Sequence, residues 1–326
     1  RAIYVVGHKN PDTDSICSAI AYAELKNRTT KLRHIPVRTG HVNEETQYVL
    51  NRFNIKRPKF MESVNTQVKD INYRETEGVD NSISLKKAWT LMQEKDVVTL
   101  PITDNRKLEG LITISDIATS YMAVYDNSII GRARTPYSNI LETIEGTLIY
   151  GNEHSYVVKG KVLIAAANPD LMEDYIEPDD IVILGNRYES QLCAIEMHAS
   201  CIIVCEGANV SLTIRKLAED NACTVISTPH DTFTVARLIN QSMPIKYFMR
   251  KDHLLTFDLD DAVDSIKEVM TKKRHRDFPI LDSKGEYVGM VSRRNLLEMR
   301  KKHVILVDHN EKTQAIDGID DAEILE

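Results

Sequence analysis

The stretch VVGHKNPDTDSICSAIAYAEL, residues 5–25, joins the end of a strand to a polar loop and the start of a helix. Residues 2–6 form a continuous apolar run, as in a strand that is buried on both faces. After the loop, apolar side chains recur with the spacing of one helix face, at Ile16, Ala19, Ile20 and Ala23. A second strand at 34–38 and a second helix at 43–53 follow. This order predicts an α/β domain with a parallel sheet.

The polar loop carries three side chains of the types that bind metals: His8, Asp12 and Asp14. Another buried strand, near the end of the chain, runs directly into Asp308 and His309. Functional groups gather beyond the carboxyl ends of parallel strands, so we expect the two sets to meet. An imidazole with carboxylates and no thiolate favours Mn²⁺, Co²⁺ or Mg²⁺. The alternative is that the aspartates only form a turn and cap a helix; the second acidic-histidine pair favours the metal.

The middle of the chain contains a repeat. LPITDNRKLEGLITISDI (100–117) and FPILDSKGEYVGMVSRRNL (278–296) share a strand, a turn, a glycine-led strand and a polar helix start. Each copy follows an amphipathic helix, and such self-similarity indicates two copies of one module. We therefore expect an α/β domain, residues 1–61 and 302–326, that is interrupted by three parts. These parts are a first repeat (62–120), an α/β middle domain (121–245) and a second repeat (246–301).

Length and composition limit the class of protein. A chain of 326 residues exceeds one ordinary core, so several domains are expected. The net charge of -7 argues against non-specific nucleic-acid binding. The apolar runs are too short to cross a bilayer. Five cysteines without a CxxC pair indicate reduced thiols and a cytoplasmic protein. We expect Cys201 and Cys205 to be buried thiols, and Trp89 and Met92 to be core residues.

Three segments closely resemble the N-terminal domain of the family II inorganic pyrophosphatases, of the DHH phosphoesterase superfamily. They are VVGHKNPDTDSICSAIAYAELK, PVRTGHVNEETQYVLNRF and VILVDHNEKTQAIDGID. The interrupting parts resemble those of the regulated subclass, in which two CBS modules flank a DRTGG domain. VISTPHDTFTVARLI (225–239) supports the DRTGG assignment, although the Asp-Arg-Thr-Gly-Gly string itself is absent.

This resemblance implies hydrolysis of pyrophosphate at a site with two or more divalent metals, Mn²⁺ or Co²⁺ with Mg²⁺. His8, Asp12, Asp14 and Asp308 would be metal ligands, and His309 would lie behind them or donate a proton. Family members continue with an Asp-His-His motif, a further ligand and a phosphate-binding domain, which do not follow here. We therefore expect that this chain is part of a longer protein and that alone it hydrolyses pyrophosphate negligibly.

CBS modules pair and commonly bind adenine nucleotides, here AMP, ADP, ATP or diadenosine polyphosphates, in the clefts between them. The residues that the resemblance assigns to nucleotide binding are Thr113, Asp116, Arg274, Arg276, Phe278, Ser292, Arg293 and Asn295. The hydroxyls and arginines would contact phosphate, the acid or amide the ribose, and Phe278 the adenine. The alternative is that the polar pairs only cap helices and that the arginines belong to a solvated charge run. Paired CBS modules also imply a homodimer.

Two other functions stay open at this point. The chain could act only as a nucleotide sensor without chemistry of its own. It could also belong to a DHH phosphoesterase that acts on nucleotides or nucleic-acid ends. The acidic net charge and the NEETQY segment argue against the phosphoesterase.

Overall fold

The structure is a computed structural model that describes residues 2–63, 65–122, 126–273, 276–299, 302–307 and 323–325. The chain divides into two compact units. The first unit consists of residues 1–76, 256–284 and 288–326, and the second of residues 77–255 and 285–287. Within the described residues, no helix has both the length and the apolar character needed to cross a membrane.

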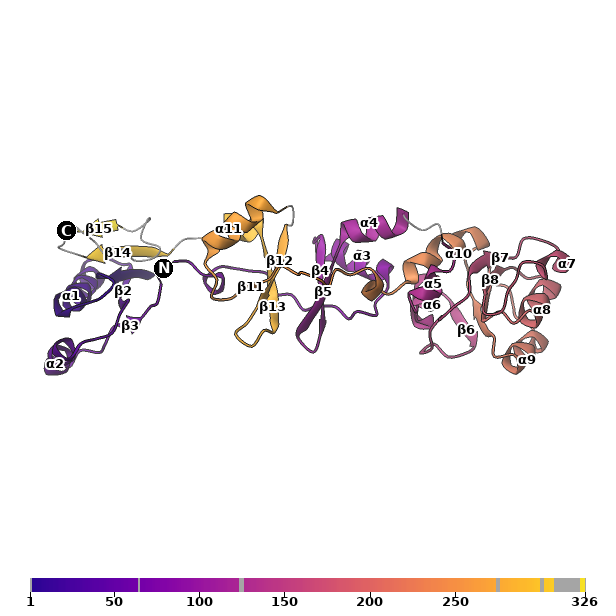
Figure 1. Cartoon of the computed structure of the whole chain (residues 1–326), viewed down its shortest axis with the longest axis horizontal. Helices are drawn as coiled ribbons and strands as arrows, with labels where there is room; N and C mark the ends of the chain where they lie inside the picture. Colours follow the sequence, from indigo (N-terminus) through magenta and orange to yellow (C-terminus); the bar gives the residue numbers. More distant parts are fainter. Residues whose placement is uncertain are drawn as a thin grey trace. The chain divides into compact units, whose positions relative to one another are not determined.

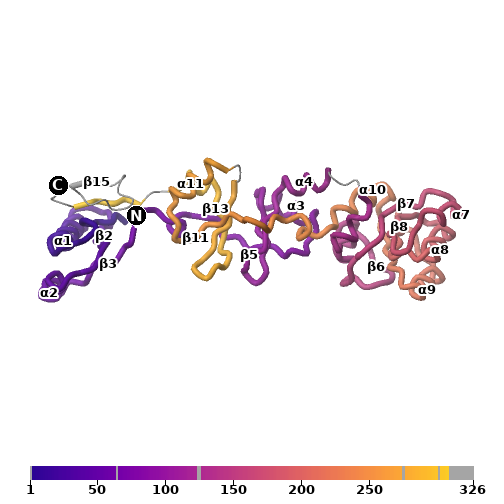
Figure 2. The backbone as a smooth tube through the Cα atoms, viewed as in Figure 1, coloured from indigo at the N-terminus to yellow at the C-terminus, as the bar shows by residue number. Residues whose placement is uncertain are grey.

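The first unit contains a five-stranded parallel sheet in the order β15-β14-β1-β2-β3. Its strands are β1 (Ala2–Val6), β2 (Arg33–Arg38), β3 (Lys59–Phe60), β14 (His303–Val307) and β15 (Glu323–Leu325). Ile3 of β1 lies opposite His303 of β14, so both ends of the chain build one sheet (Figure 1, Figure 2). The predicted α/β fold with a parallel sheet, interrupted by the repeats, is confirmed.

Two helices accompany this sheet, α1 (Thr13–Thr29) and α2 (Glu44–Arg52). Ala19 and Ala23 of α1 pack with Val5 of β1, because their spacing places them on one face of the helix. Asn43 caps α2 by accepting a 2.7 Å hydrogen bond from the Thr46 backbone N–H. The helix that follows the polar loop is thus anchored on the first strand.

The second repeat also lies in the first unit. It contains β11 (Phe257–Asp258), β12 (Asp277–Leu281), β13 (Tyr287–Ser292), α11 (Val263–Lys272) and α12 (Arg293–Leu297). The segment that precedes the first repeat packs on the second repeat instead of on its own. It contains η1 (Val68–Asp70) and forms β-bridges from Gln67 to Ala262 and from Arg74 to Met290. Val68 and Ile71 are buried in the core of the second repeat.

The first repeat lies in the second unit and shows the reciprocal arrangement. It contains α3 (Leu85–Glu94), the antiparallel pair β4 (Thr99–Asp104) and β5 (Lys107–Thr113), and α4 (Ile114–Met122). Here the leading segment comes from the second repeat: η3 (Ile245–Tyr247) follows a bridge from Pro244 to Ser84, and Arg250 bridges to Leu111. The two repeats therefore exchange their leading segments.

The exchange explains a glycine that both repeats share. A Cβ atom on Gly110 would lie 2.7 Å from the carbonyl oxygen of Arg250. A Cβ atom on Gly289 would lie 2.6 Å from the carbonyl oxygen of Arg74. Only glycine permits this close backbone approach, and the two arginines occupy equivalent places.

The middle domain is a three-layer α/β/α arrangement around a sheet of order β6-β10-β9-β8-β7. Its strands are β6 (Thr147–Tyr150), β7 (Val162–Ile164), β8 (Ile181–Leu184), β9 (Cys201–Val204) and β10 (Thr224–Ser227), of which only β6 is antiparallel. One face packs on α7 (Pro169–Met172), α8 (Tyr188–Glu196) and α9 (Leu212–Asp220). The other packs on α5 (Ile129–Arg132), α6 (Tyr137–Thr143) and α10 (Thr232–Leu238), which η2 (Ile239–Ser242) follows.

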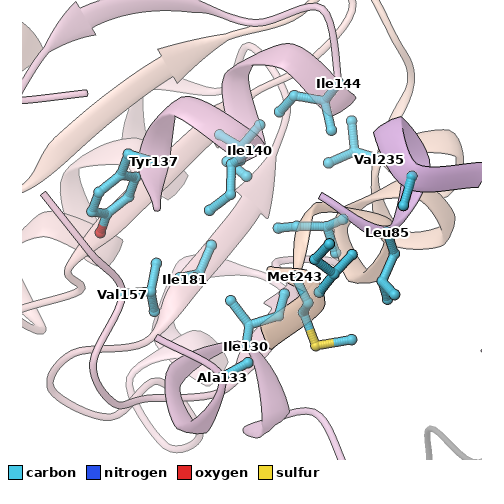
Figure 3. Close-up of a cluster of buried hydrophobic side chains, with 14 of the residues drawn as sticks. Leu85, Ile130, Ala133, Tyr137, Ile140, Ile144, Val157, Ile181, Val235 and Met243 are labelled. Carbon is cyan, nitrogen blue, oxygen red and sulfur yellow. The ribbon is translucent and has the colours of Figure 1, made fainter. Parts of the chain in front are cut away.

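The middle domain and the first repeat share one hydrophobic core. Leu85 of α3 belongs to the same buried cluster as Ile140 of α6 and Val235 of α10. Met243, which precedes the exchanged segment, also lies there (Figure 3). The Leu85 backbone N–H donates to the carbonyl of Met243 at 3.0 Å. These two parts therefore pack as one body within the second unit.

All five cysteines are free, and three of them are fully buried in the middle domain. The prediction of buried thiols at Cys201 and Cys205 is confirmed. Burial raises the pKa of Cys205 and of Cys223 to about 12, from an ordinary value of 9.0. The unfolded state therefore releases these protons first, so the stability they contribute below pH 9.0 is lost as the pH rises toward 12.

We expect a thiol reagent at about pH 8 to modify Cys17 in the folded chain and to leave Cys201, Cys205 and Cys223 unmodified until denaturant is added. The urea midpoint should be lower at about pH 11 than at about pH 9, because the unfolded thiols ionise first. Counting modified thiols by mass spectrometry checks the first expectation, and urea titrations at both pH values check the second. Rapid modification of all five thiols in the native chain would contradict the buried arrangement.

Candidate functional site

The loop between β1 and α1 holds His8 close to Asp12. The His8 Nε2 atom lies 3.4 Å from Asp12 Oδ1. The same carboxylate oxygen caps α1 by accepting a 2.8 Å hydrogen bond from the Ser15 backbone N–H. This backbone hydrogen bond, with a smaller contribution from His8, lowers the pKa of Asp12. Asp12 is therefore an ionised carboxylate beside an imidazole, and it is also a helix cap.

The loop conformation follows from the residues around it. The Ser15 hydroxyl accepts a 3.1 Å hydrogen bond from the His8 backbone N–H. A side chain on Gly7 would clash with that hydroxyl, so glycine is required before His8. Thr39, which follows β2, donates to the carbonyl oxygen of His8 at 3.3 Å. The ends of two neighbouring strands thus fix the position of His8.

The His8 imidazole and the Asp12 carboxylate, which lie together in this loop, are ligands of the types that hard or borderline divalent metals bind. Asp14 is on the first turn of α1, where the Ser18 hydroxyl lies 3.5 Å from its Oδ1. Among the residues described, no three His, Cys, Asp or Glu side chains are grouped to hold a metal. Asp308 and His309 lie outside the described residues. The structure brings together His8 and Asp12; the larger ligand set stays a prediction.

In the first repeat, Thr113 and Asp116 form a closed hydrogen-bond network at the start of α4. Asp116 Oδ2 accepts hydrogen bonds from the Thr113 backbone N–H at 2.9 Å and from the Thr113 hydroxyl at 2.8 Å. Asp116 Oδ1 accepts from Nε and Nη2 of Arg250 at 3.0 and 2.9 Å. Both carboxylate oxygens are therefore engaged by protein donors.

In the second repeat, Ser292 and Asn295 form the matching arrangement at the start of α12. Asn295 Oδ1 accepts from the backbone N–H and the hydroxyl of Ser292, each at 2.9 Å. The Asn295 amide donates to the carbonyl of Asn72 at 2.9 Å. Each pair caps its helix, as the structural alternative predicted, and the same caps present the groups that the nucleotide hypothesis needs.

The other predicted nucleotide contacts fall in three kinds of place. Phe278 is buried in the core of the second repeat, where its ring meets that of Phe257 edge to face at 5.3 Å. Arg276 and Arg293 are exposed, and Arg293 Nη2 donates to the Met270 carbonyl at 2.8 Å. Arg274 lies outside the described residues. Their roles stay predictions.

A polar cavity lies beside Asn295. It has a volume of about 440 Å³ and is lined by Asp70, Ile71, Asn72, Asn295, Glu298 and Met299. The lining combines the exchanged segment of the first repeat with α12 of the second. The exchange of leading segments therefore builds a hollow next to one of the predicted ribose contacts.

Sequence reasoning missed Arg250 and Arg74. They occupy equivalent places in the exchanged segments, yet only Arg250 meets an acid at the helix start, since Asp116 corresponds to Asn295. Arg74 Nη2 lies 3.8 Å from Asp277, and its buried Nε has no hydrogen-bond partner in the described chain. The available signal was an arginine shortly before each repeat, in NYRET and FMRKD. Its pairing depends on the exchange, which the sequence does not reveal.

The prediction that Trp89 is a core residue is wrong. Leu85, Ala88 and Met92 form the buried face of α3, whereas 47% of Trp89 is exposed. Trp89 directly follows Ala88 and therefore lies at the edge of the buried face of α3. It lines an apolar cavity of about 330 Å³ with Ile114, Ile117, Tyr121 and other side chains. Met92 is buried as predicted.

The domain composition defines the class of protein. A CBS domain model matches residues 68–123 and 245–302, and a DRTGG domain model matches residues 139–242. The regulatory region of Clostridium perfringens pyrophosphatase, solved as its CBS and DRTGG domains with the activator diadenosine tetraphosphate, is similar in structure. It is 36% identical with a TM-score of 0.67, over 70% of this chain and 100% of that one.

Two curated relatives match along almost the whole chain. The cobalt-dependent inorganic pyrophosphatase of C. perfringens is 42% identical over 325 residues. A probable manganese-dependent inorganic pyrophosphatase of Thermotoga maritima is 33% identical over 325 residues. Each alignment covers 99% of this chain and 59% of the relative, so the chain spans about three fifths of their length. The chain is therefore a homologue of the family II inorganic pyrophosphatases, and it contains CBS and DRTGG domains.

Proposed function

We propose that the protein containing this chain hydrolyses inorganic pyrophosphate to two phosphates with the help of Mn²⁺ or Co²⁺ and Mg²⁺. The observation that carries this proposal is the similarity to a cobalt-dependent pyrophosphatase across 99% of the chain, including the loop that pairs His8 with Asp12. His8, Asp12, Asp14 and Asp308 would hold the metals, and His309 would lie beside them. The metals would activate water and neutralise charge on the reacting phosphates.

Phosphate release by the full-length enzyme, measured with pyrophosphate in the presence of Mn²⁺, Co²⁺ or Mg²⁺, tests this function. A panel with nucleotides and oligonucleotides separates a pyrophosphatase from a phosphoesterase of wider substrate range. We expect metal-dependent release from pyrophosphate only. Turnover of oligonucleotides with no turnover of pyrophosphate would overturn the proposal.

The two repeats would regulate this activity by binding AMP, ADP, ATP or a diadenosine polyphosphate. Asp116 and Asn295 would contact ribose, and Thr113 and Ser292 would lie near phosphate. The similar regulatory region from C. perfringens, whose activator is diadenosine tetraphosphate, supports this assignment. A nucleotide changes activity only by binding two states of the protein unequally.

Isothermal calorimetry of this chain with AMP, ATP and diadenosine tetraphosphate should show binding, and Asp116→Ala should weaken it at least about tenfold, since two ribose hydrogen bonds to a charged group are lost. Asp104→Ala, which changes an exposed residue at the end of β4, is the matched control and should bind normally. No heat with any of the three ligands would contradict nucleotide sensing.

The free thiols of all five cysteines are consistent with a reducing compartment, the cytoplasm, as the place where the enzyme works.

The apolar surface formed by Trp89, Ile114, Tyr121 and Met122 on α3 and α4 would be covered by a second copy of the chain in a homodimer.

We expect Trp89→Glu to convert a dimer to a monomer, because it places a charge in this apolar surface. Light scattering coupled to gel filtration measures the change. Lys95→Glu, on an exposed residue that follows α3, adds a negative charge outside the surface and should leave the mass unchanged. A monomeric wild-type chain, or a dimer that survives Trp89→Glu, would contradict the assignment.

A further inference from the structure

We propose that Arg250 makes the nucleotide half-site of the first repeat selective for phosphorylated ligands. The inference rests on the proposed nucleotide binding and concerns which part of the ligand is recognised. It starts from the ion pair between Arg250 and Asp116, in which 14% of the Asp116 side chain and 49% of the Arg250 side chain are exposed. The acid is largely enclosed, and the guanidinium reaches solvent.

A ribose needs a carboxylate oxygen that can accept from its two hydroxyl groups. Thr113 already donates twice to Asp116 Oδ2, and Arg250 donates twice to Oδ1. The Thr113 bonds are part of the cap of α4, and the Arg250 bonds come from a side chain that is half exposed. Ribose therefore gains access to Asp116 most readily by displacing Arg250.

The displaced guanidinium loses two charge-assisted hydrogen bonds and needs a new anion. A phosphate group supplies one, because its oxygens match the planar donors of arginine in a bidentate geometry. Adenosine offers ribose without phosphate, so its binding leaves Arg250 uncompensated. AMP and larger nucleotides offer both groups. The exchange of partners thus favours phosphorylated ligands over nucleosides.

Among its described residues, the second repeat shows no equivalent ion pair at the helix start. Its helix start carries neutral Asn295, whose oxygen accepts from Ser292 and whose amide donates to Asn72. The equivalent arginine, Arg74, lies near Asp277 instead. Ribose can reach Asn295 without breaking an ion pair. The preference for phosphorylated ligands that Arg250 would create therefore applies to the first repeat.

The test compares adenosine, AMP and diadenosine tetraphosphate by calorimetry on this chain. The variants are Arg250→Ala, Arg250→Lys and, as a control, Arg215→Ala, which removes an exposed arginine from α9. Heat that disappears in Asp116→Ala is assigned to the first repeat. We expect Arg250→Ala to reduce the ratio of AMP to adenosine affinity by about tenfold, with tighter adenosine binding, because the competing donor is gone.

Arg250→Lys should give a smaller change, since an ammonium group keeps the charge without the bidentate geometry. Arg215→Ala should leave the ratio unchanged. An unchanged ratio in Arg250→Ala, with AMP still bound, would overturn the role of Arg250 and leave nucleotide sensing intact. Weaker adenosine binding would show that Arg250 orients Asp116 for ribose, which also overturns the inference. If wild type and all variants bind none of the ligands, the proposed nucleotide function fails, and this inference fails with it.

Discussion

Asp12→Asn is expected to reduce metal-dependent pyrophosphate hydrolysis by the full-length enzyme more than about 100-fold, while the stability of the fold changes little. The loss should exceed the roughly 10- to 100-fold cost of altering a residue behind a metal ligand, because Asp12 would bind the metal directly. Stability should be kept because asparagine caps a helix as well as aspartate does. The amide oxygen of the substituted side chain would still accept from the Ser15 backbone N–H, and only the charge would be lost.

The chain provides a matched control for this substitution. Asp231 caps α10 with the same geometry, accepting from the Thr234 backbone N–H at 2.7 Å, and it belongs to the middle domain. Asp231→Asn should leave hydrolysis and its metal dependence unchanged. Initial rates of phosphate release over a range of Mn²⁺ concentrations, with melting curves for each variant, measure both effects. Normal turnover by Asp12→Asn would show that Asp12 serves only as a cap.

The first strand, the polar loop and α1 could be predicted because each depends on local sequence. The apolar run of β1 and the spacing of Ile16, Ala19 and Ala23 fix what is buried, and a parallel sheet then places the loop at its edge. The sequence also indicated that β1 and β14 belong to one sheet, because both are short apolar strands that are followed by metal-type ligands.

The exchanged segments could not be predicted in this way. Whether the chain before a repeat packs on its own repeat or on the other one depends on long-range contacts, such as those of Arg250 with Leu111. These contacts leave no periodic signal. The ion pair of Arg250 with Asp116 could not be predicted for the same reason, because it forms only when the exchanged segment packs on the first repeat. Trp89 was misplaced because a large apolar residue beside a helix face resembles a core residue in sequence.

Asp180→Ala is expected to lower the free energy of unfolding of the second unit by about 3 kcal/mol, because two backbone N–H groups lose a charged acceptor at roughly 1–3 kcal/mol each. Asp180 directly precedes β8, and only 1% of its side chain is exposed. Its carboxylate accepts from the backbone N–H groups of Lys161 and Glu177 at 3.0 and 2.9 Å and lies 2.9 Å from Lys161 Nζ. Alanine leaves the two backbone N–H groups without their acceptor, whereas Lys161 Nζ keeps its contact with Glu177.

Glu177→Ala is the matched control, because Glu177 contacts the same Lys161 Nζ at 2.8 Å with 74% of its side chain exposed. An exposed ion pair contributes about 0 to 1 kcal/mol, so this variant should differ little from the wild type. Urea titrations followed by far-ultraviolet circular dichroism measure both free energies. If both variants lost the same free energy of unfolding, the burial of Asp180 would not explain its contribution to stability.

Fluorescence of Trp89 makes the same experiment a test of the shared core. Trp89 is the single tryptophan of the chain and lies in the first repeat, whereas Asp180 lies in the middle domain. Because one cluster joins Leu85 and Met92 to Ile140, Ile181 and Val235, unfolding of either part should expose the core of the other. The tryptophan midpoint should therefore fall with Asp180→Ala by as much as the dichroism midpoint. A tryptophan transition that keeps its wild-type midpoint would show that the two parts unfold separately despite their common packing.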